Sequence, residues 1–402
     1  MMNAASTQRA RTLLIANLLG QMAFGLLAMT ISIPSMQEWG AIFGSSQSNV
    51  QLTFSAYLLA FGGLQLVYGP LSDQLGRKRM LLAGLSLAGV GSVLAALAPD
   101  LATLTAARVL QGAGSAAGMV VGRAMVQDLF HGPERTRVMA YVGMVMGLCP
   151  PLATIVGGQL HVRLGWQANF VLIAALAAVL LLAAWRGLPA PHKPVAGRPH
   201  WFANMLSSYS RLLREPVFLL YVAILSMTTA TFYAFLGGAP IVLGSYGVGP
   251  EGIGYYIMCI PAAYIVGNYL TTHLVHRARE GLIMALGQMF TVGGIGLMLA
   301  LGLAGLNTPL ALALPLLLLG LGHGFLMPST LAGTVGVLPA LAGSAAAVAG
   351  VLQQLMGAVG SYAVGLFPHH GVVNLGVLMM AFTLCAAAAQ VLMHRRPASA
   401  TG

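Results

Sequence analysis

Residues 69–80 read GPLSDQLGRKRM, and they place one acid and three consecutive bases between two long apolar runs. Charge is scarce elsewhere, since 7% of the 402 residues are charged and 58% are hydrophobic. A chain with so few polar side chains cannot cover the surface of a soluble globule of this length. We therefore expect a polytopic membrane protein in which the charged stretch connects two membrane-spanning helices.

Twelve apolar runs approach the roughly 20 residues that a helix needs to cross a hydrocarbon core of about 30 Å. They predict an all-α membrane protein, because a helix satisfies its own backbone hydrogen bonds in lipid. The 12 expected transmembrane helices are residues 13–36, 50–72, 79–98, 101–123, 138–160, 166–186, 216–237, 252–273, 281–303, 309–331, 342–366 and 371–393.

The positions of the bases predict the orientation of the chain. If the N-terminus is cytoplasmic, 17 of the 19 Lys and Arg residues lie in the two tails or in cytoplasmic connections. The exceptions are Arg108, inside a span, and Arg163, in an outer loop. This bias follows the positive-inside rule, so both termini are expected in the cytoplasm. The net charge of +11 is then an orientation signal, and no nucleic-acid partner is expected.

The longest polar stretch, residues 187–215, divides the chain into six spans and six spans. We predict an N-terminal six-helix bundle at 1–186, a cytoplasmic linker at 187–215 and a C-terminal six-helix bundle at 216–402. Two pseudo-symmetric bundles around a midplane cavity are a common transporter architecture. Within the linker, WFANMLSSYSRLL can form a short helix at the membrane surface.

The stretch GPLSDQLGRKRMLL resembles the G-x-L-x-D-x-x-G-R-[KR] signature of the major facilitator superfamily, between its helices 2 and 3. Together with ARVLQGAG in span 4 and RAMVQDLF at its end, it is similar to the bicyclomycin-resistance (Bcr/CflA) branch of drug efflux transporters. The resemblance implies the two-bundle fold of that superfamily and export of small amphipathic compounds by proton antiport. It also implies multi-pass residence in a bacterial inner membrane.

The charged stretch has a physical interpretation of its own. Gly69 and Gly76 permit close backbone approach and a tight turn, and Asp73 can bond to a helix N-terminus or to a base. Arg77 offers a planar fork to a carboxylate, for which Asp128 at the inner end of span 4 is a candidate. In the resembled family such a cluster locks the cytoplasmic side. The alternative is that the bases only anchor the topology.

Span 4 carries a buried charge and a series of small residues. Arg108 lies roughly 10 Å along the helix from its outer end, where a charge usually faces a cavity and has a partner. The resemblance implies a role in proton coupling or in the electrostatics of the cavity, and snorkelling to the outer surface is the alternative. Gly114, Gly118 and Gly122 have the G-x-x-x-G spacing that lets another helix approach closely.

Span 5 contains GLCPPLATIVGG, which resembles the antiporter motif P-x-A-P-x-x-G-G of the family. Thr154 stands at the place of its second proline. Prolines inside a helix remove hydrogen bonds, so this segment is expected to bend. The helix-bend residues are Pro150, Pro151, Gly157 and Gly158.

None of the eight acids lies at the centre of a span. Where the resembled branch has an Asp in helix 1, MTISIPSM places Thr30. Besides Arg108, two candidates for proton coupling remain. Glu38 can accept a proton at the outer mouth if the first helix extends that far, and His323 in span 10 can titrate near neutral pH. The alternatives are a solvated loop acid and a neutral packing histidine.

Neutral polar side chains on several spans predict a mostly apolar central cavity, although each could equally bond one helix to another. A cavity without fixed carboxylates favours neutral or anionic amphipathic substrates. The candidate substrate-binding residues are Asn17, Gln21, Phe24, Tyr57, Gln65, Gln111, Tyr233, Asn268, His323 and Gln353.

The predicted function is secondary active multidrug efflux by alternating access. The alternatives are a metabolite or sugar-type exporter and an uncoupled facilitator; an enzyme or a sensor is disfavoured, because no intramembrane His/Asp/Glu cluster offers a catalytic pair. Neither a metal nor another cofactor is expected, since Cys149, Cys259 and Cys385 lack metal-ligand spacing and no G-x-x-x-x-G-K-[ST] loop occurs. We expect a monomer whose partners are its substrate, protons and the lipid bilayer.

Overall fold

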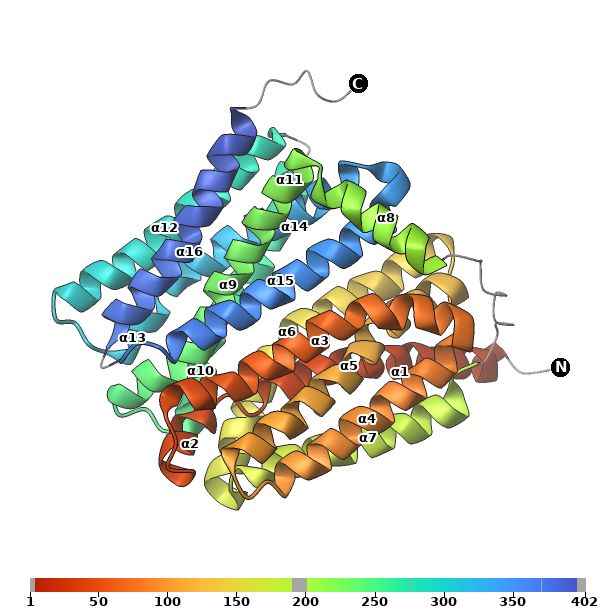
Figure 1. The fold of residues 1–402 in the computed structure, drawn as a ribbon, viewed down its shortest axis with the longest axis horizontal. Coiled ribbons are helices and arrows are strands. Elements are labelled where there is room, and N and C mark those ends of the chain that lie inside the picture. Colours follow the sequence, from red (N-terminus) through yellow and green to blue (C-terminus); the bar gives the residue numbers. More distant parts are fainter. Residues whose placement is uncertain (1–3, 190–200, 276, 370, 396–402) are drawn as a thin grey trace. The chain divides into compact units, whose positions relative to one another are not determined.

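The computed structural model describes residues 4–189, 201–275, 277–369 and 371–395, and all regular structure in these ranges is helical. This confirms the predicted all-α class (Figure 1). The central part of the predicted linker, residues 190–200, lies outside the described residues.

Eleven helical segments are long and apolar enough to cross a membrane. The helix α5 (Leu101–Leu129) is not among them, although it has 29 residues. Its polar side chains Arg108, Gln111 and Ser115 are all buried against neighbouring helices. A span enclosed by protein needs less apolar surface than one that faces lipid, so α5 is consistent with the fourth of the twelve predicted spans.

The chain divides into two compact units, which share helix α3 (Gln47–Leu75). Unit 1 contains residues 1–35 and 56–199, and unit 2 contains residues 36–55 and 200–402. Besides the later part of α3, the helices of unit 1 are α1 (Ala4–Thr30), α4 (Arg77–Ala96), α5, α6 (Gly132–Leu164) and α7 (Gln167–Gly187). Unit 2 contains the start of α3 together with α2 (Met36–Ile42), α8 (Trp201–Leu213), α9 (Pro216–Ser245), α10 (Pro250–Ile257), α11 (Cys259–Leu274), α12 (Glu280–Leu303), α13 (Pro309–Ala313), α14 (Leu316–Gly336), the 3₁₀ turn η1 (Pro339–Leu341), α15 (Ala342–Val364) and α16 (Val372–His394).

In unit 1, helix α5 packs closely against α1 and α4. A side chain at Gly114 would collide with the backbone of α4 at Ala88, and one at Gly118 would collide with the carbonyl oxygen of Gln21 on α1. The predicted packing role of the glycine series is therefore confirmed. Since α1 and α4 also contact α7, these four helices form the core of the unit.

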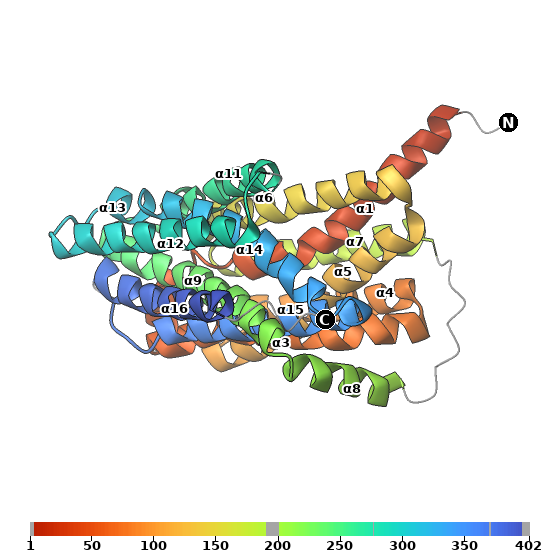
Figure 2. The ribbon, with the colours of Figure 1, turned by 90° about the horizontal axis from the view of Figure 1, so that it is seen from above.

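In unit 2, helix α9 packs against α14, α15 and α16, and α12 packs against α14 and α16. Residue Leu212 of α8 is completely buried with Phe218 of α9 and Ala345 of α15. The predicted short helix at 201–213 is thus present, and Figure 2 shows it running at an angle to α9. The first turns of α3 also belong to this unit, because the Gln51 amide donates to the carbonyl of Gly237 at 2.8 Å.

Three predicted spans end or break earlier than their hydropathy suggests. Helix α1 ends at Thr30 and turns follow through Ser35, so span 1 does not continue as a helix to residue 36. Span 8 consists of α10 and α11, and span 10 consists of α13 and α14. By contrast, α6 is assigned as one helix through Pro150 and Pro151, and the bend expected there stays a prediction.

Candidate functional site

The charged stretch that joins α3 to α4 forms a compact cluster in unit 1. The Arg77 guanidinium donates from Nε to Oδ2 of Asp128 at 3.1 Å, and its NH1 lies 2.5 Å from Oδ1 of Asp73. The same nitrogen donates to the Ser72 hydroxyl at 2.6 Å. The predicted contact between Arg77 and Asp128 is therefore confirmed. We call Ser72, Asp73, Arg77 and Asp128 the Arg77 cluster.

The two glycines of this stretch differ in their roles. Gly76 has a φ of 96°, a backbone conformation that other residues rarely adopt, so the predicted tight turn before α4 is confirmed. Gly69 lies within α3, where an added Cβ would come no closer than 3.8 Å to Val120. The close backbone approach expected at Gly69 is wrong, because a Cβ at this position would make only an ordinary van der Waals contact with the Val120 side chain.

Lys78 and Arg11 reinforce the same end of unit 1. The Lys78 amine donates to the carbonyls of Trp185 and Leu188 at 2.7 Å each, and these carbonyls terminate α7. A cation is favourable there because the end of a helix leaves carbonyl groups unpaired and carries partial negative charge. Arg11 on α1 pairs with Glu134 in the first turn of α6.

Arg108 is buried at the point where α1 ends. Its NH1 donates to the carbonyl of Ala28 at 2.7 Å, and its NH2 donates to the carbonyl of Met29 at 3.2 Å. These carbonyls belong to the last turn of α1, which a helix terminus leaves without intrahelical partners. The guanidinium therefore caps α1 from α5, and its charge lies where the helix dipole is negative.

The other neighbours of Arg108 are neutral. NH1 also donates to Oε1 of Gln111 at 2.5 Å, and Gln111 in turn donates to the Ser92 hydroxyl at 2.8 Å. The ring of Tyr57 lies 4.4 Å from the guanidinium carbon, which is cation–π distance. Only 1% of the Arg108 surface is exposed, so the snorkelling alternative is wrong.

Among the described residues, no carboxylate pairs with Arg108 and no group of three or more His, Cys, Asp or Glu could hold a metal ion. Thr30, at the position of the expected helix-1 acid, is fully buried and donates to the carbonyl of Leu26 at 2.8 Å. The charge of Arg108 is consequently met by carbonyl dipoles and an aromatic face instead of an acid.

Four candidate substrate residues of unit 1 make hydrogen bonds between helices or around Arg108. Asn17 donates to the carbonyl of Ala183, and Gln21 donates to the carbonyl of Leu180, at 2.7 and 3.0 Å. The Tyr57 hydroxyl donates to the carbonyl of Gly25 at 2.7 Å. Gln111 belongs to the Arg108 network described above. These contacts match the alternative that the polar side chains bond one helix to another.

Phe24 and Gln65 are the remaining candidates of unit 1. Phe24 is 1% exposed, and Gln65 is half-buried.

The candidates of unit 2 are dispersed over four helices. Tyr233 on α9 is buried edge-on to Phe54, with ring centroids 6.0 Å apart, and Gln353 on α15 donates to the Thr229 hydroxyl at 3.0 Å. Asn268 on α11 is half-buried. His323 on α14 is 3% exposed, and its Nε2 has no hydrogen-bond partner among the described residues.

The acids lie near helix ends, as predicted. Glu38 is exposed on α2, and because α1 stops at Thr30, the helix extension that its proton-acceptor role required is absent. Asp100 caps α5 by accepting from the Thr103 amide at 2.7 Å, and this hydrogen bond lowers the pKa of Asp100. Glu134, Glu251 and Glu280 lie in the first turns of α6, α10 and α12.

The antiporter-like segment of α6 contacts α1. Gly157 and Gly158 are both buried, and a side chain at Gly157 would collide with the carbonyl of Ile31. Thr154 is 1% exposed and donates back to the carbonyl of Pro150 at 2.6 Å. This is the bond that a Thr hydroxyl often makes within a helix to the carbonyl four residues earlier, and it satisfies the hydroxyl where water is excluded.

Sequence reasoning did not predict the partners of Lys78 or the contact of Arg108 with the end of α1. Gly76 lies one residue before α4 begins, so the turn at this glycine determines where α4 starts and where Lys78 lies. A glycine next to a run of bases is therefore a signal in the sequence for the position of Lys78. The Arg108 contact depends on where α1 stops, and the early stop coincides with Pro34 only three residues beyond the first turn residue. A proline after a helix is a recognised stop signal.

The structure thus combines membrane-spanning helices in two units with a charged turn and a buried arginine, which is the arrangement of a polytopic transporter fold. A profile described as the Major Facilitator Superfamily matches residues 13–361, and the chain belongs to this family. The family places it among transporters.

Its relatives include proteins named for drug resistance. Multidrug resistance protein D of Escherichia coli (strain K12) is 27% identical over 89% of each chain. The chloramphenicol resistance protein of Pseudomonas aeruginosa is 26% identical over 86% of this chain and 82% of its own length. A bicyclomycin resistance protein homolog of Haemophilus influenzae is 28% identical over 65% of this chain and 66% of its own length. The resemblance stated from the sequence is confirmed.

Proposed function

We propose that this protein is a secondary multidrug exporter that moves small amphipathic compounds out of the cell by alternating access and proton antiport. The observation that carries the proposal is the similarity to Multidrug resistance protein D and to the chloramphenicol resistance protein over 89% and 86% of the chain. Both matches span the two units, so they cover the architecture that alternating access requires.

The Arg77 cluster is proposed as the latch of the cytoplasmic side. Arg77 bonds to carboxylates at the end of α3 and the end of α5, so it joins the start of α4 to both of these helices. Since its side chain is 19% exposed, these pairs remain accessible to water and can break and reform during a transport cycle. Breaking them costs little, which suits a latch better than a permanent bond.

The proposed substrates are neutral or anionic. Arg108 brings a fixed positive charge into unit 1, and the eight acids lie near helix ends. A cavity with this charge distribution would repel a permanent cation at its centre. Arg108 and His323 stay the candidates for proton coupling, while Glu38 is less suited because of its exposure on α2.

The test is a susceptibility panel in a drug-sensitive bacterial strain with and without expression of the protein. We expect raised resistance to chloramphenicol or bicyclomycin, no change for a quaternary ammonium dye, and loss of the resistance when a protonophore is added at a sublethal dose. Arg77→Gln should abolish the resistance while membrane levels of the protein are maintained. Strong resistance to the dye alone would contradict the substrate proposal.

An uncoupled facilitator or a metabolite exporter is the second candidate, favoured by Thr30 in the place of the expected acid. Resistance that survives the protonophore would favour the facilitator. We further propose a monomer in a bacterial inner membrane with both termini in the cytoplasm. Cysteine labelling of an added C-terminal Cys in intact and lysed cells tests that orientation.

A further inference from the structure

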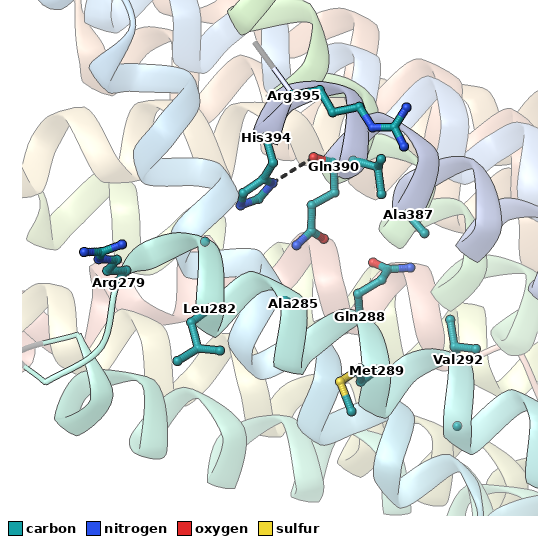
Figure 3. Close-up of a pocket in the computed structure, with 13 residues that line it drawn as sticks. Arg279, Leu282, Ala285, Gln288, Met289, Val292, Ala387, Gln390, His394 and Arg395 are labelled. Carbon is teal, nitrogen blue, oxygen red and sulfur yellow. Dashed lines mark hydrogen bonds between the residues drawn. The ribbon is translucent and has the colours of Figure 1, made fainter. Parts of the chain in front are cut away.

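A cavity of about 990 Å³ opens between α12 and α16, within unit 2 and apart from the candidate site (Figure 3). Its wall is formed largely by apolar side chains, including Leu282 and Met289 of α12 and Val391 of α16. These three side chains are 55%, 69% and 50% exposed, so the cavity is an open groove with an apolar rim. In a helix that crosses a bilayer, such a rim contacts lipid chains.

Two arginines line the groove at one end. Arg279 immediately precedes α12, and Arg395 immediately follows α16, so the antiparallel pairing of these helices brings both to the same end of the groove. Neither guanidinium has a hydrogen-bond or ion-pair partner among the described residues. The neighbouring acid Glu280 lies outside the groove lining and accepts from the Tyr221 hydroxyl at 3.4 Å. Among the described residues of unit 2, no carboxylate pairs with either guanidinium, so this end of the groove carries positive charge.

The N-terminus of α12 adds to this positive end. Gly281 lines the groove, and its lack of a side chain leaves room for the His394 ring, which a Cβ at this position would strike. The amides of Leu282 and Ile283 donate to the carbonyl of Arg279, and the start of the helix carries the positive end of its dipole. An anionic head group at the groove mouth would thus lie beside a helix N-terminus, with Arg279 on one side and Arg395 on the other (Figure 3).

Two buried amides face the groove below the arginines. Gln288 and Gln390 are 8% and 6% exposed, and Figure 3 shows their side chains directed toward one another from α12 and α16. The Oε1 atom of each has no hydrogen-bond partner among the described residues. Gln390 lies five residues from Arg395, roughly 7.5 Å along the helix. That is about the thickness of the interfacial layer between the outer edge of the head groups and the hydrocarbon core.

In unit 1, a lysine bridges the ends of the two helices that correspond to α12 and α16. There α4 packs against α7, and Lys78 at the start of α4 donates to the final carbonyls of α7. In the described part of unit 2, the corresponding base, Arg279, makes no such contact with the end of α16. The difference leaves the two arginines of unit 2 available to a ligand from outside the protein.

From these features we infer that the groove between α12 and α16 binds one anionic phospholipid, whose head group lies at the end lined by Arg279 and Arg395 and whose acyl chain lies along Leu282 and Met289. A basic pocket between transmembrane helices is a recognised form of anionic lipid site. An amphipathic molecule with a negative end fits this charge pattern, whereas a zwitterionic phospholipid would bring an ammonium group to the two arginines.

The test uses the full chain purified in detergent, with phosphatidylglycerol and phosphatidylethanolamine of identical acyl chains as probes. Native mass spectrometry measures the bound fraction of each lipid. We expect at least tenfold tighter binding of phosphatidylglycerol than of phosphatidylethanolamine. The double variant R279Q/R395Q should lose this preference.

The matched control is R214Q/R277Q, which removes two exposed arginines that do not line the groove. It should bind phosphatidylglycerol as the unmodified chain does. The single variants R279Q and R395Q, each expected to lose part of the preference, replace the double variant if its thermal unfolding shows that it does not fold.

Equal binding of phosphatidylglycerol by both double variants would overturn the inference. So would equal binding of the two lipids by the unmodified chain. Displacement of the lipid by chloramphenicol would assign the groove to a transported compound, and a dimer that forms as lipid is removed would assign it to a second copy of the chain. Each of these results would also overturn the lipid site.

Discussion

Arg108 shows how a charge can be held inside a membrane protein without a counter-ion. Its guanidinium meets two terminal carbonyls of α1, the amide of Gln111 and the face of Tyr57. Each partner carries a partial negative charge, and together they stabilise the guanidinium without a carboxylate. The arginine is therefore both a structural cap and a fixed charge in the bundle.

Replacing Arg108 by Met should destabilise the protein, because each carbonyl of α1 left buried without a partner costs about 1–3 kcal/mol. Arg108→Lys should retain part of the stability, since Lys keeps the charge but not the planar fork. Thermal unfolding in detergent measures both variants.

The control for Arg108 is Arg163→Met, which removes an exposed base near the end of α6. Its effect should stay within about 0.5 kcal/mol. If Arg108→Met unfolds at the same temperature as the unmodified chain, the capping role is wrong.

The two carboxylates of the Arg77 cluster should contribute unequally. The Asp128 side chain is 24% exposed and Asp73 is 55% exposed, so water screens the second pair more strongly. Double-mutant cycles with R77Q, D128N and D73N should give a coupling of about 1 kcal/mol for Asp128 and a few tenths for Asp73. A larger coupling for Asp73 would show that the main latch contact has been misassigned.

At the scale of helices, close packing in unit 1 depends on glycine at particular positions. Gly118→Ala would press a methyl group into the Gln21 carbonyl, and overpacking of this kind costs about 1–3 kcal/mol. Gly143→Ala on α6 meets open space and should stabilise the protein by about 0.4–1 kcal/mol. Unfolding temperatures that shift in the same direction for both variants would contradict the packing described for α1 and α5.

The turn between α15 and α16 should make stability depend on pH. His369 is 6% exposed, and its Nε2 donates to the carbonyl of Val364 at 2.8 Å. Burial lowers the pKa of His369 below 6.5, so the folded protein prefers the neutral ring. The contribution of the neutral ring to the free energy of unfolding is complete above about pH 6.5. It is lost as the pH falls through the lower pKa that His369 has in the folded state.

His369→Gln should remove this pH dependence, since glutamine does not titrate. Unfolding temperatures of both proteins measured from pH 7.5 to 4.5 provide the comparison. Parallel curves would show that His369 does not contribute to acid sensitivity.

How much the sequence predicts differs between contacts and helices. Apolar runs of about 20 residues predict the spans because the bilayer sets their length, and the pairing of Arg77 with Asp128 follows from the scarcity of charge. The partners of Asn17 and Gln21 do not follow, because lipid-facing and buried sides of a span are both apolar and leave no periodicity that fixes helix rotation. The break between α10 and α11 does have a signal, because Pro261 has no amide hydrogen to donate to the carbonyl of Ile257.

For the molecule as a whole, the two units repeat one helix order but differ in their polar contacts. Unit 1 holds the Arg77 cluster and Arg108, and unit 2 holds His323 and the groove between α12 and α16. Substitutions that disable the lipid groove should therefore leave the Arg77 cluster intact. We expect R279Q/R395Q to retain at least a tenth of the drug resistance of the unmodified chain, and Arg77→Gln to retain less than that.

The central claim is proton-driven export, and proteoliposomes with an imposed pH gradient test it most directly. Chloramphenicol is neutral, so its distribution does not follow the gradient by itself. An antiporter should accumulate it above equilibrium when the interior is acidic, with accumulation abolished by a protonophore and absent in Arg77→Gln. Uptake to the same level with and without the gradient would contradict the claim and establish an uncoupled facilitator.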